Sequence, residues 1–138
     1  MVILLYVSSA VKLFSDAELL ELLEKARKNN TAMDITGMLL YQDGNFMQLL
    51  EGPEEAVKTL AAKIMLDPRH CGFLKLLERH TDQREFGDWK MGFKKIDKDF
   101  TGIPGYSDFL TVPFNSDEYK QTPSKALKLM LNFKQMVR

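Results

Sequence analysis

Two apolar runs that meet at an Asp-Gly turn limit the folds open to this chain more than any other feature. Residues 35–41 and 45–51 are separated only by Gln42-Asp43-Gly44, and Asp-Gly between such runs is a strong signal for a β-hairpin. In the second run apolar side chains occupy successive positions, so both faces of that strand carry them. The sequence therefore predicts a strand that is covered on both sides.

One residue in the second run, Gln48, does not match its apolar surroundings. Side chains alternate along a strand, so Phe46, Gln48 and Leu50 share one face. Met47 and Leu49 lie on the other. A buried carboxamide needs partners for its acceptor and its two donors, and each unmet group costs about 1–3 kcal/mol. We therefore expect a polar group beside Gln48, which could be a side chain, a water molecule or a ligand.

Capping residues and helix breakers define two helices. Ser15 and Glu18 have the spacing of a capping box, and the apolar periodicity that follows them runs to the polar segment 28–30. Pro53 suits the first turn of a second helix, and Asp67-Pro68 is expected to end it. Residues 28–30 are accordingly interpreted as the end of the first helix.

The remaining apolar runs complete the fold prediction. Further strands are predicted at 2–8, at 73–77 with a possible extension to Thr81, and at 89–96. The resulting order is βαββαββ, which predicts an α+β, ferredoxin-like sheet with one extra strand and with both helices on one face. Strand 2–8 is apolar on both faces, so the second face of the sheet also needs cover.

The C-terminal part of the chain is the expected cover. Residues 97–123 carry several glycines and prolines and are predicted to be loop with short helical turns. A last helix is predicted from Pro123-Ser124 onward. We therefore expect a folded domain at 1–96 and, at 97–138, a C-terminal helical extension that covers the other face of the sheet.

Composition and charge exclude several classes of partner. The 138 residues suggest one domain, and 19 basic residues balance 19 acidic ones. This balance gives no electrostatic reason to expect nucleic acid or an acidic membrane. A single cysteine excludes an internal disulfide framework, and the absence of a Cys/His cluster argues against a metal site. The first seven residues lack a basic segment and are too short to span a bilayer, so we expect a cytoplasmic protein.

Tyr6 is a candidate partner for Gln48. In a ferredoxin-like sheet the first strand and the strand that carries Gln48 are central neighbours, so the two side chains meet if both face the helices. A phenol can give up an electron and a proton, while an amide can relay the proton and reorient. The simpler alternative is that both are core residues with local hydrogen-bond partners.

Several motifs, in order and at matching separations, give the chain a family resemblance. Residues 1–96 resemble the BLUF domain, the family of blue-light sensors that use flavin, and the tail resembles that of its short, stand-alone members. The motifs that carry the resemblance are Tyr6-x-Ser8, Lys28-Asn29-Asn30, Asp34-Ile35-Thr36-Gly37-Met38-Leu39, Asn45-Phe46-x-Gln48-x-Leu50-Glu51-Gly52, Asp67-x-Arg69-His70 and Trp89-x-Met91-Gly92-Phe93.

The resemblance implies a flavin, usually FAD with FMN as the alternative, held between the two helices with its ring near the sheet. By motif position Tyr6 matches the photochemical tyrosine and Gln48 the switching glutamine. Asn30 matches the residue that hydrogen-bonds the flavin ring. Trp89 and Met91 match the pair on the fifth strand that is linked to signal output, and which of the two lies near the flavin is left open.

A polar segment after the second helix is assigned to the rest of the cofactor. Asp67, Arg69 and His70 match the region beside the ribityl and phosphate groups, and Lys63 lies one helical turn earlier, where it can help. The alternative for Arg69 and His70 is a solvated surface pair.

Three further residues complete the candidate site. Phe46 and Ile64 are expected to form walls of an apolar slot for the ring, although both would be plain core in a protein without a ligand. Asn29 stands where many relatives carry a basic residue or His, a difference that bears on ligand affinity or dark recovery. Asn30, and alternatively Asn29, could instead cap the first helix.

The resemblance implies a photoreceptor that turns over no substrate. Excitation would draw an electron and then a proton from Tyr6, and Gln48 would rearrange by rotation or tautomerisation. The change would pass through the fifth strand and the C-terminal helix to a separate signalling protein, and self-association through that helix is expected.

Two other functions fit the same fold less well. An acyl phosphate hydrolase would need a glycine-rich anion loop after the first strand, but residues 8–12 contain no glycine. An RNA-binding module would show exposed aromatic and basic residues on the central strands. Here Phe46 lies in an apolar run and the net charge is zero.

Overall fold

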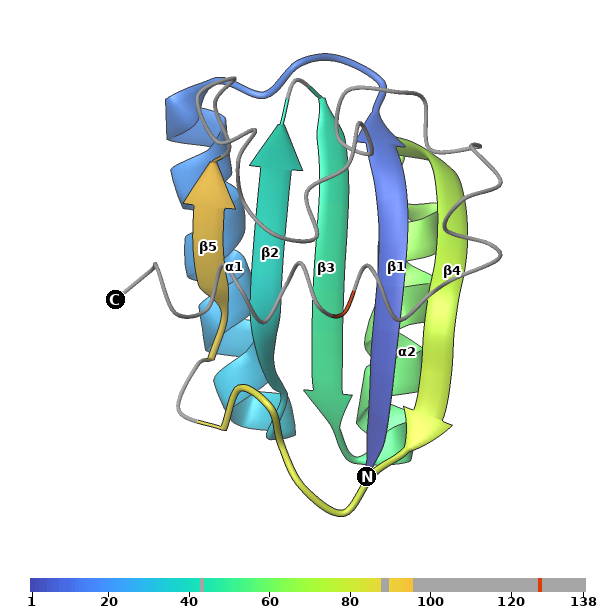
Figure 1. The fold of residues 1–138 in the computed structure, drawn as a ribbon. Helices are drawn as coiled ribbons and strands as arrows, with labels where there is room; N and C mark the ends of the chain where they lie inside the picture. Colours follow the sequence, from blue (N-terminus) through green and yellow to red (C-terminus); the bar gives the residue numbers. More distant parts are fainter. Residues whose placement is uncertain (43, 88–89, 96–126, 128–138) are drawn as a thin grey trace, which may run out of the picture.

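The computed structural model describes residues 1–42, 44–87, 90–95 and 127. Within them the elements follow the predicted order βαββαββ (Figure 1). Their bounds are β1 Val2–Ala10, α1 Asp16–Met33, β2 Thr36–Gln42, β3 Asn45–Gly52, α2 Glu54–Leu66, β4 His70–His80 and β5 Gly92–Lys95. The α+β, ferredoxin-like class is thus confirmed. Neither described helix is both long and apolar enough to cross a membrane.

The sheet places β1 and β3 side by side near its centre. The strand order is β4-β1-β3-β2-β5, with β5 parallel to β2 and the other neighbours antiparallel. In the β1–β3 ladder Tyr6 is directly opposite Gln48. Figure 1 shows both helices on the same face of the sheet, as predicted. The topology therefore brings together two residues that are 42 positions apart in the sequence.

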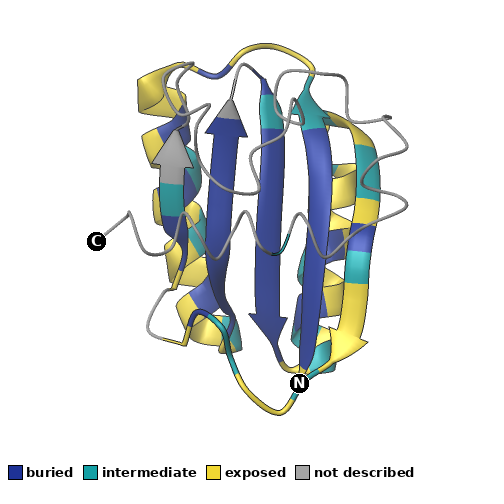
Figure 2. Ribbon diagram, in the orientation of Figure 1, coloured by how far each residue is buried: buried dark blue, intermediate teal, exposed yellow. Residues whose placement is uncertain are grey.

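Both faces of the central strands are buried, as their two-sided apolar pattern predicts (Figure 2). On the helix-covered face Tyr6 and Leu50 belong to the main core cluster. On the other face the side chains are at most 1% exposed, namely Ile3, Leu5, Val7, Met38, Leu40, Met47 and Leu49. The predicted cover of this second face, a helical extension at 97–138, lies outside the described residues apart from Leu127.

Helix α1 begins where the sequence predicts and ends later. The capping box is present, with Ser15 Oγ accepting from the Glu18 N–H at 3.2 Å. The predicted end at 28–30 is wrong, because the helix continues to Met33. Asp34, in the left-handed conformation (φ 57°), provides the C-cap. Asn30 thus lies inside the helix, where its carbonyl accepts from the Ile35 N–H at 2.9 Å, and its side chain is not a C-terminal cap.

The edge strand β4 is longer and less regular than predicted. It spans His70–His80, whereas the prediction was 73–77 with a possible extension to Thr81, and its ladder with β1 shifts register twice. At one shift Val7 pairs with Leu74 but Ser9 pairs with Cys71, so two residues of β4 oppose one residue of β1. This arrangement is a β-bulge.

The hairpin and the second helix follow the prediction closely. Gln42 pairs with Asn45, which leaves a two-residue connection, and Gly44 has the positive φ (86°) that such turns require. Asp43 lies outside the described residues. Helix α2 starts directly after Pro53 and ends before Asp67.

A buried carboxylate on β3 fixes the loop between β4 and β5. Glu51 is fully buried, and its Oε1 accepts from Thr36 Oγ1 at 3.0 Å and from the Phe86 N–H at 2.6 Å. Its Oε2 accepts from the Glu85 N–H at 2.8 Å. Arg84 also donates to Thr36 Oγ1, at 2.9 Å. The loop that leads towards β5 is therefore held on the end of the strand that carries Gln48.

Candidate functional site

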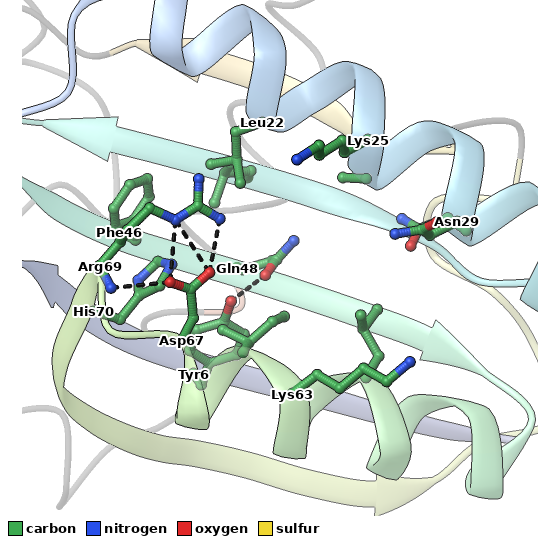
Figure 3. Close-up of a pocket in the computed structure, with 15 residues that line it drawn as sticks. Tyr6, Leu22, Lys25, Asn29, Phe46, Gln48, Lys63, Asp67, Arg69 and His70 are labelled. Atoms are coloured by element: carbon green, nitrogen blue, oxygen red, sulfur yellow. Dashed lines mark hydrogen bonds and ion pairs between the residues drawn. The ribbon is translucent and has the colours of Figure 1, made fainter.

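A cleft between the two helices and the sheet contains the candidate site (Figure 3). Its cavity of about 200 Å³ is lined by Tyr6, Leu22, Lys25, Ala26, Asn29, Asn30, Leu39, Phe46, Gln48, Leu60, Lys63, Ile64, Asp67, Arg69 and His70. All eight residues predicted to bind the cofactor are in this set, together with the predicted tyrosine and glutamine. Met91 contacts the glutamine from the side of β5, whereas Trp89 lies outside the described residues.

Tyr6 and Gln48 form a hydrogen-bonded pair at the base of the cleft. The Tyr6 hydroxyl donates to Gln48 Oε1, and the two residues are only 1% and 6% exposed. On its other side Gln48 Nε2 contacts the Met91 sulfur at 3.5 Å. A thioether can only accept, so the amide nitrogen belongs on that side and the amide oxygen faces the phenol. Gln48 therefore connects the tyrosine to the residue that precedes β5.

Burial raises the pKa of Tyr6 well above the usual value for a phenol. The phenol consequently stays protonated at all ordinary pH values. An electron that leaves Tyr6 must then be accompanied or followed by the phenol proton, and Gln48 Oε1 is the acceptor in contact with it. The geometry thus suits coupled loss of an electron and a proton.

Asn30 provides a buried hydrogen-bond acceptor on the wall of the cleft. Its side chain is 1% exposed, and Nδ2 donates to the Lys90 carbonyl at 2.7 Å. Among the described residues its Oδ1 has no hydrogen-bond partner. Such a group costs about 1–3 kcal/mol unless something donates to it. A flavin ring carries an N–H between two carbonyls, so this orphaned oxygen in an apolar slot fits the cofactor.

The walls of the slot combine aromatic and aliphatic side chains. The Phe46 ring packs between Tyr41, at 4.9 Å between centroids, and His70, at 5.0 Å. Phe14 meets Phe46 edge-on at 5.3 Å. Ile64 faces the cleft from α2. Phe46 is therefore both part of the core and a wall of the cavity.

The polar mouth of the cleft is built around Asp67 and Arg69. Arg69 Nη2 lies 2.7 Å from Asp67 Oδ2, and this hydrogen bond lowers the pKa of Asp67 to about 2. His70 shares a hydrogen bond with the buried Ser8 Oγ at 3.1 Å, and burial lowers the pKa of its imidazole. Arg69 and His70 thus have separate partners and do not form a solvated pair with each other.

Sequence reasoning missed part of the site on α1. Leu22, Lys25 and Ala26 line the cleft with Asn29, and their helical spacing puts them on one face, which could have identified them. Lys25 on α1 and Lys63 on α2 thereby place a cation on each helix wall. No comparable signal in the sequence pointed to Arg27, whose Nε donates to the Met91 carbonyl at 3.1 Å.

Comparison with known proteins agrees with this geometry. Residues 1–92 match the family model described as BLUF, sensors of blue-light using FAD. The chain is 42% identical over 77 residues to the blue light- and temperature-regulated antirepressor BluF of Escherichia coli, covering 56% of this chain and 19% of that protein. It is 41% identical over 89 residues to the photoactivated adenylate cyclase subunit beta of Euglena longa, covering 64% of this chain and 10% of that protein.

Solved structures give the same result. The dark-state structure of BlrB, a BLUF protein, superposes with a TM-score of 0.80 at 26% identity, covering 99% of this chain and 96% of that one. The photo-activated state of BlsA superposes with a TM-score of 0.73 at 28% identity, covering 94% of each chain. The matched domain binds flavin and senses light, and it is not an enzyme. The chain therefore belongs to the BLUF family of blue-light sensors.

Proposed function

We propose that this blue-light sensor works through the contact chain Tyr6–Gln48–Met91, with FAD as its flavin. The observation that carries the proposal is the position of Gln48, which accepts from the phenol on one side and contacts the Met91 sulfur on the other. A rearrangement of this single amide changes both contacts together. It thereby links the photochemistry to the residue that directly precedes β5.

Two sets of residues would hold the cofactor. The Asn30 oxygen and the Phe46 and Ile64 walls suit the flavin ring, because Asn30 lines the cleft with an unpartnered acceptor and the two walls are apolar. Lys25 and Lys63 suit the phosphates, since the described residues offer neither lysine an ion-pair partner. FAD in place of FMN is supported by the family description. Mass spectrometry of the flavin released from cell-expressed protein tests this choice.

When bound, the flavin supplies a blue-absorbing ring that becomes a strong oxidant on excitation. Tyr6 is the phenol at the cleft, and it loses its electron and proton in a coupled way because burial keeps it protonated. Gln48 Oε1 accepts the proton as the hydrogen-bond partner of the hydroxyl. The amide then rotates or tautomerises, an electron and a proton return to Tyr6, and the contact between Nε2 and the Met91 sulfur is left changed.

The segment before β5 is the route by which the change leaves the cleft. Met91 is held through its carbonyl by Arg27, and Lys90 is held through its carbonyl by Asn30. Strand β5 is a short edge strand that pairs only with β2 in the described sheet. We propose that the signal continues into the C-terminal extension and acts on a separate partner protein or on a homo-oligomer.

Relatives support such an output, although the chain spans only about a tenth to a fifth of the length of the BluF and cyclase relatives. One of them is an antirepressor and the other is part of a photoactivated cyclase. The partner of this chain is accordingly a proposal of its own. We also propose a cytoplasmic location, which suits the free, exposed thiol of Cys71 because reducing compartments keep thiols reduced.

Absorption spectra of the flavin-loaded protein, taken in the dark and after blue light, test the proposal. We expect a red shift of the main band that reverses in the dark. Gln48→Leu should retain flavin and show no shift, because leucine can neither accept from Tyr6 nor donate to Met91. A normal, reversible shift in that variant would remove Gln48 from the mechanism.

A further inference from the structure

Phe73 lies face to face with the Tyr6 ring. The two ring centroids are 4.4 Å apart and the ring planes differ by 21°. No other ring stacks on Tyr6 within the part of the chain that the structure describes. Offset stacking of this kind restricts both partners, because an aromatic ring moves mainly through two side-chain torsions. Phe73 therefore limits the orientations open to the Tyr6 hydroxyl.

The irregular path of β4 places Phe73 there. Tyr6 pairs across the ladder with Lys75, so Phe73, two residues earlier, is its diagonal neighbour on the same face. The bulge falls at Gly72 and Phe73, which together oppose Ser8. Gly72 has a left-handed φ of 62°, a conformation that glycine adopts without strain. Bulges commonly re-aim a side chain next to a functional site.

Phe73 also stands between Tyr6 and a second cavity. A groove of about 360 Å³ between α2 and β4 is lined by Leu4, Lys58, Ala61, Ala62, Met65, Phe73, Lys75 and Glu78. Tyr6 lines the cofactor cleft but not this groove. The Phe73 side chain is only partly buried, whereas Tyr6 is 1% exposed. One face of the phenol is thus shielded from the groove by the Phe73 ring.

We propose that Phe73 is a positioning residue for the light reaction, holding the Tyr6 hydroxyl on Gln48 and keeping groove water away from the phenol. This inference rests on the proposed roles of Tyr6 and Gln48. If the Tyr6 ring can tilt, its hydroxyl is hydrogen-bonded to the amide oxygen of Gln48 for a smaller fraction of the time. A water molecule that reaches the hydroxyl competes for its proton. Both effects lower the yield of the light-shifted state without removing any group that binds the flavin.

Three substitutions of Phe73 separate stacking from shielding. Phe73→Leu keeps an apolar side chain but removes the ring, and Phe73→Ala also opens the groove. Phe73→Tyr keeps the ring and serves as the rescue variant. Loss of one aromatic pair corresponds to a drop of about 2- to 12-fold in the population of the stacked Tyr6 orientation. We therefore expect the quantum yield of the red shift to fall by about this factor in the Leu and Ala variants and to stay near wild type in the Tyr variant.

The matched control is Leu76→Ala, because Leu76 is a buried residue of the same strand that lines neither cavity. All variants are measured at equal flavin occupancy, with yield, dark-recovery rate and the H₂O/D₂O ratio of that rate recorded. Only Phe73→Ala should speed dark recovery and change the isotope ratio, because only it admits water. If Phe73→Ala does not fold, the Leu and Tyr variants still decide the stacking role through the yield.

Two results would overturn the proposal. The first is a wild-type yield in folded Phe73→Leu, and the second is a loss in Leu76→Ala as large as the loss in Phe73→Leu. Failure of the proposed function is recognisable separately, because the wild-type protein would then show no red shift, or Gln48→Leu would keep it. A normal wild-type shift with unaffected Phe73 variants rejects the positioning role alone.

Discussion

Replacing Glu51 with alanine should destabilise the protein more than any single change at the mouth of the cleft. The carboxylate is fully buried and accepts from two backbone N–H groups of the loop before β5, at 2.6 and 2.8 Å. Its third donor, the buried Thr36 hydroxyl, keeps the bond that its oxygen accepts from Arg84 but loses the acceptor of its own O–H. Two unmet N–H groups and one unmet O–H group, at about 1–3 kcal/mol each, give an expected loss of about 3–9 kcal/mol. That loss is a large share of the ~5–15 kcal/mol typical of a folded domain.

Glu51→Gln is the matched control, because it keeps the shape and one acceptor oxygen. That oxygen can still serve Phe86, while the new NH₂ group would face the Glu85 N–H as a second donor. We expect a loss of about 1–3 kcal/mol, between wild type and alanine. Urea unfolding at a fixed excess of flavin measures both variants, since bound ligand adds stability by mass action. An alanine variant within about 0.5 kcal/mol of wild type, the range of ordinary surface changes, would refute this account of the loop.

Three further predictions concern the cleft itself. Tyr6→Phe should stay folded and bind flavin. It should no longer form the red-shifted product, and its flavin fluorescence lifetime should be longer. An unchanged yield of the red-shifted product would mean that another donor, such as Trp89, carries the reaction. Asn30→Ala should purify with less flavin, because it removes the orphaned oxygen, and unchanged occupancy together with unchanged dark recovery would contradict that role. The contribution of the Asp67–Arg69 pair to the stability of the folded protein should be complete above about pH 4. It should be lost as the pH falls towards 2, because the folded pKa of Asp67 is depressed from 3.8 to about 2. An acid titration of flavin release should therefore show a weaker pH dependence in Asp67→Asn, and identical titrations would argue against the pair.

Features of the sequence that depend on local chemistry predicted the fold well. The hairpin follows from Asp43-Gly44, and the start of α1 follows from the Ser15 capping box, both of which need only neighbouring residues. The pairing of Tyr6 with Gln48 follows from topology, since the element order fixes which strands are neighbours. These predictions required no knowledge of side-chain packing.

Features that depend on tertiary packing were missed or misjudged. The polar segment Lys28-Asn29-Asn30 resembles a helix end, but Asn30 is buried and donates to the Lys90 carbonyl, which favours a longer helix. The bulge at Gly72 cannot be located from β-propensity, because it depends on how β4 meets β1. For the same reason neither the Phe73 stack nor the contact from Arg27 to Met91 was foreseen.

The Asn30 side chain joins two equilibria. Its Nδ2 is bonded to the Lys90 carbonyl, and the residue lines the cofactor cleft with an Oδ1 that has no partner among the described residues, so flavin binding and the placement of the segment before β5 share one amide. Thermodynamic linkage then requires reciprocity. If flavin changes the affinity of a partner for this segment by some factor, that partner must change the affinity for flavin by the same factor. Cofactor retention would thus report on partner binding, even in the dark.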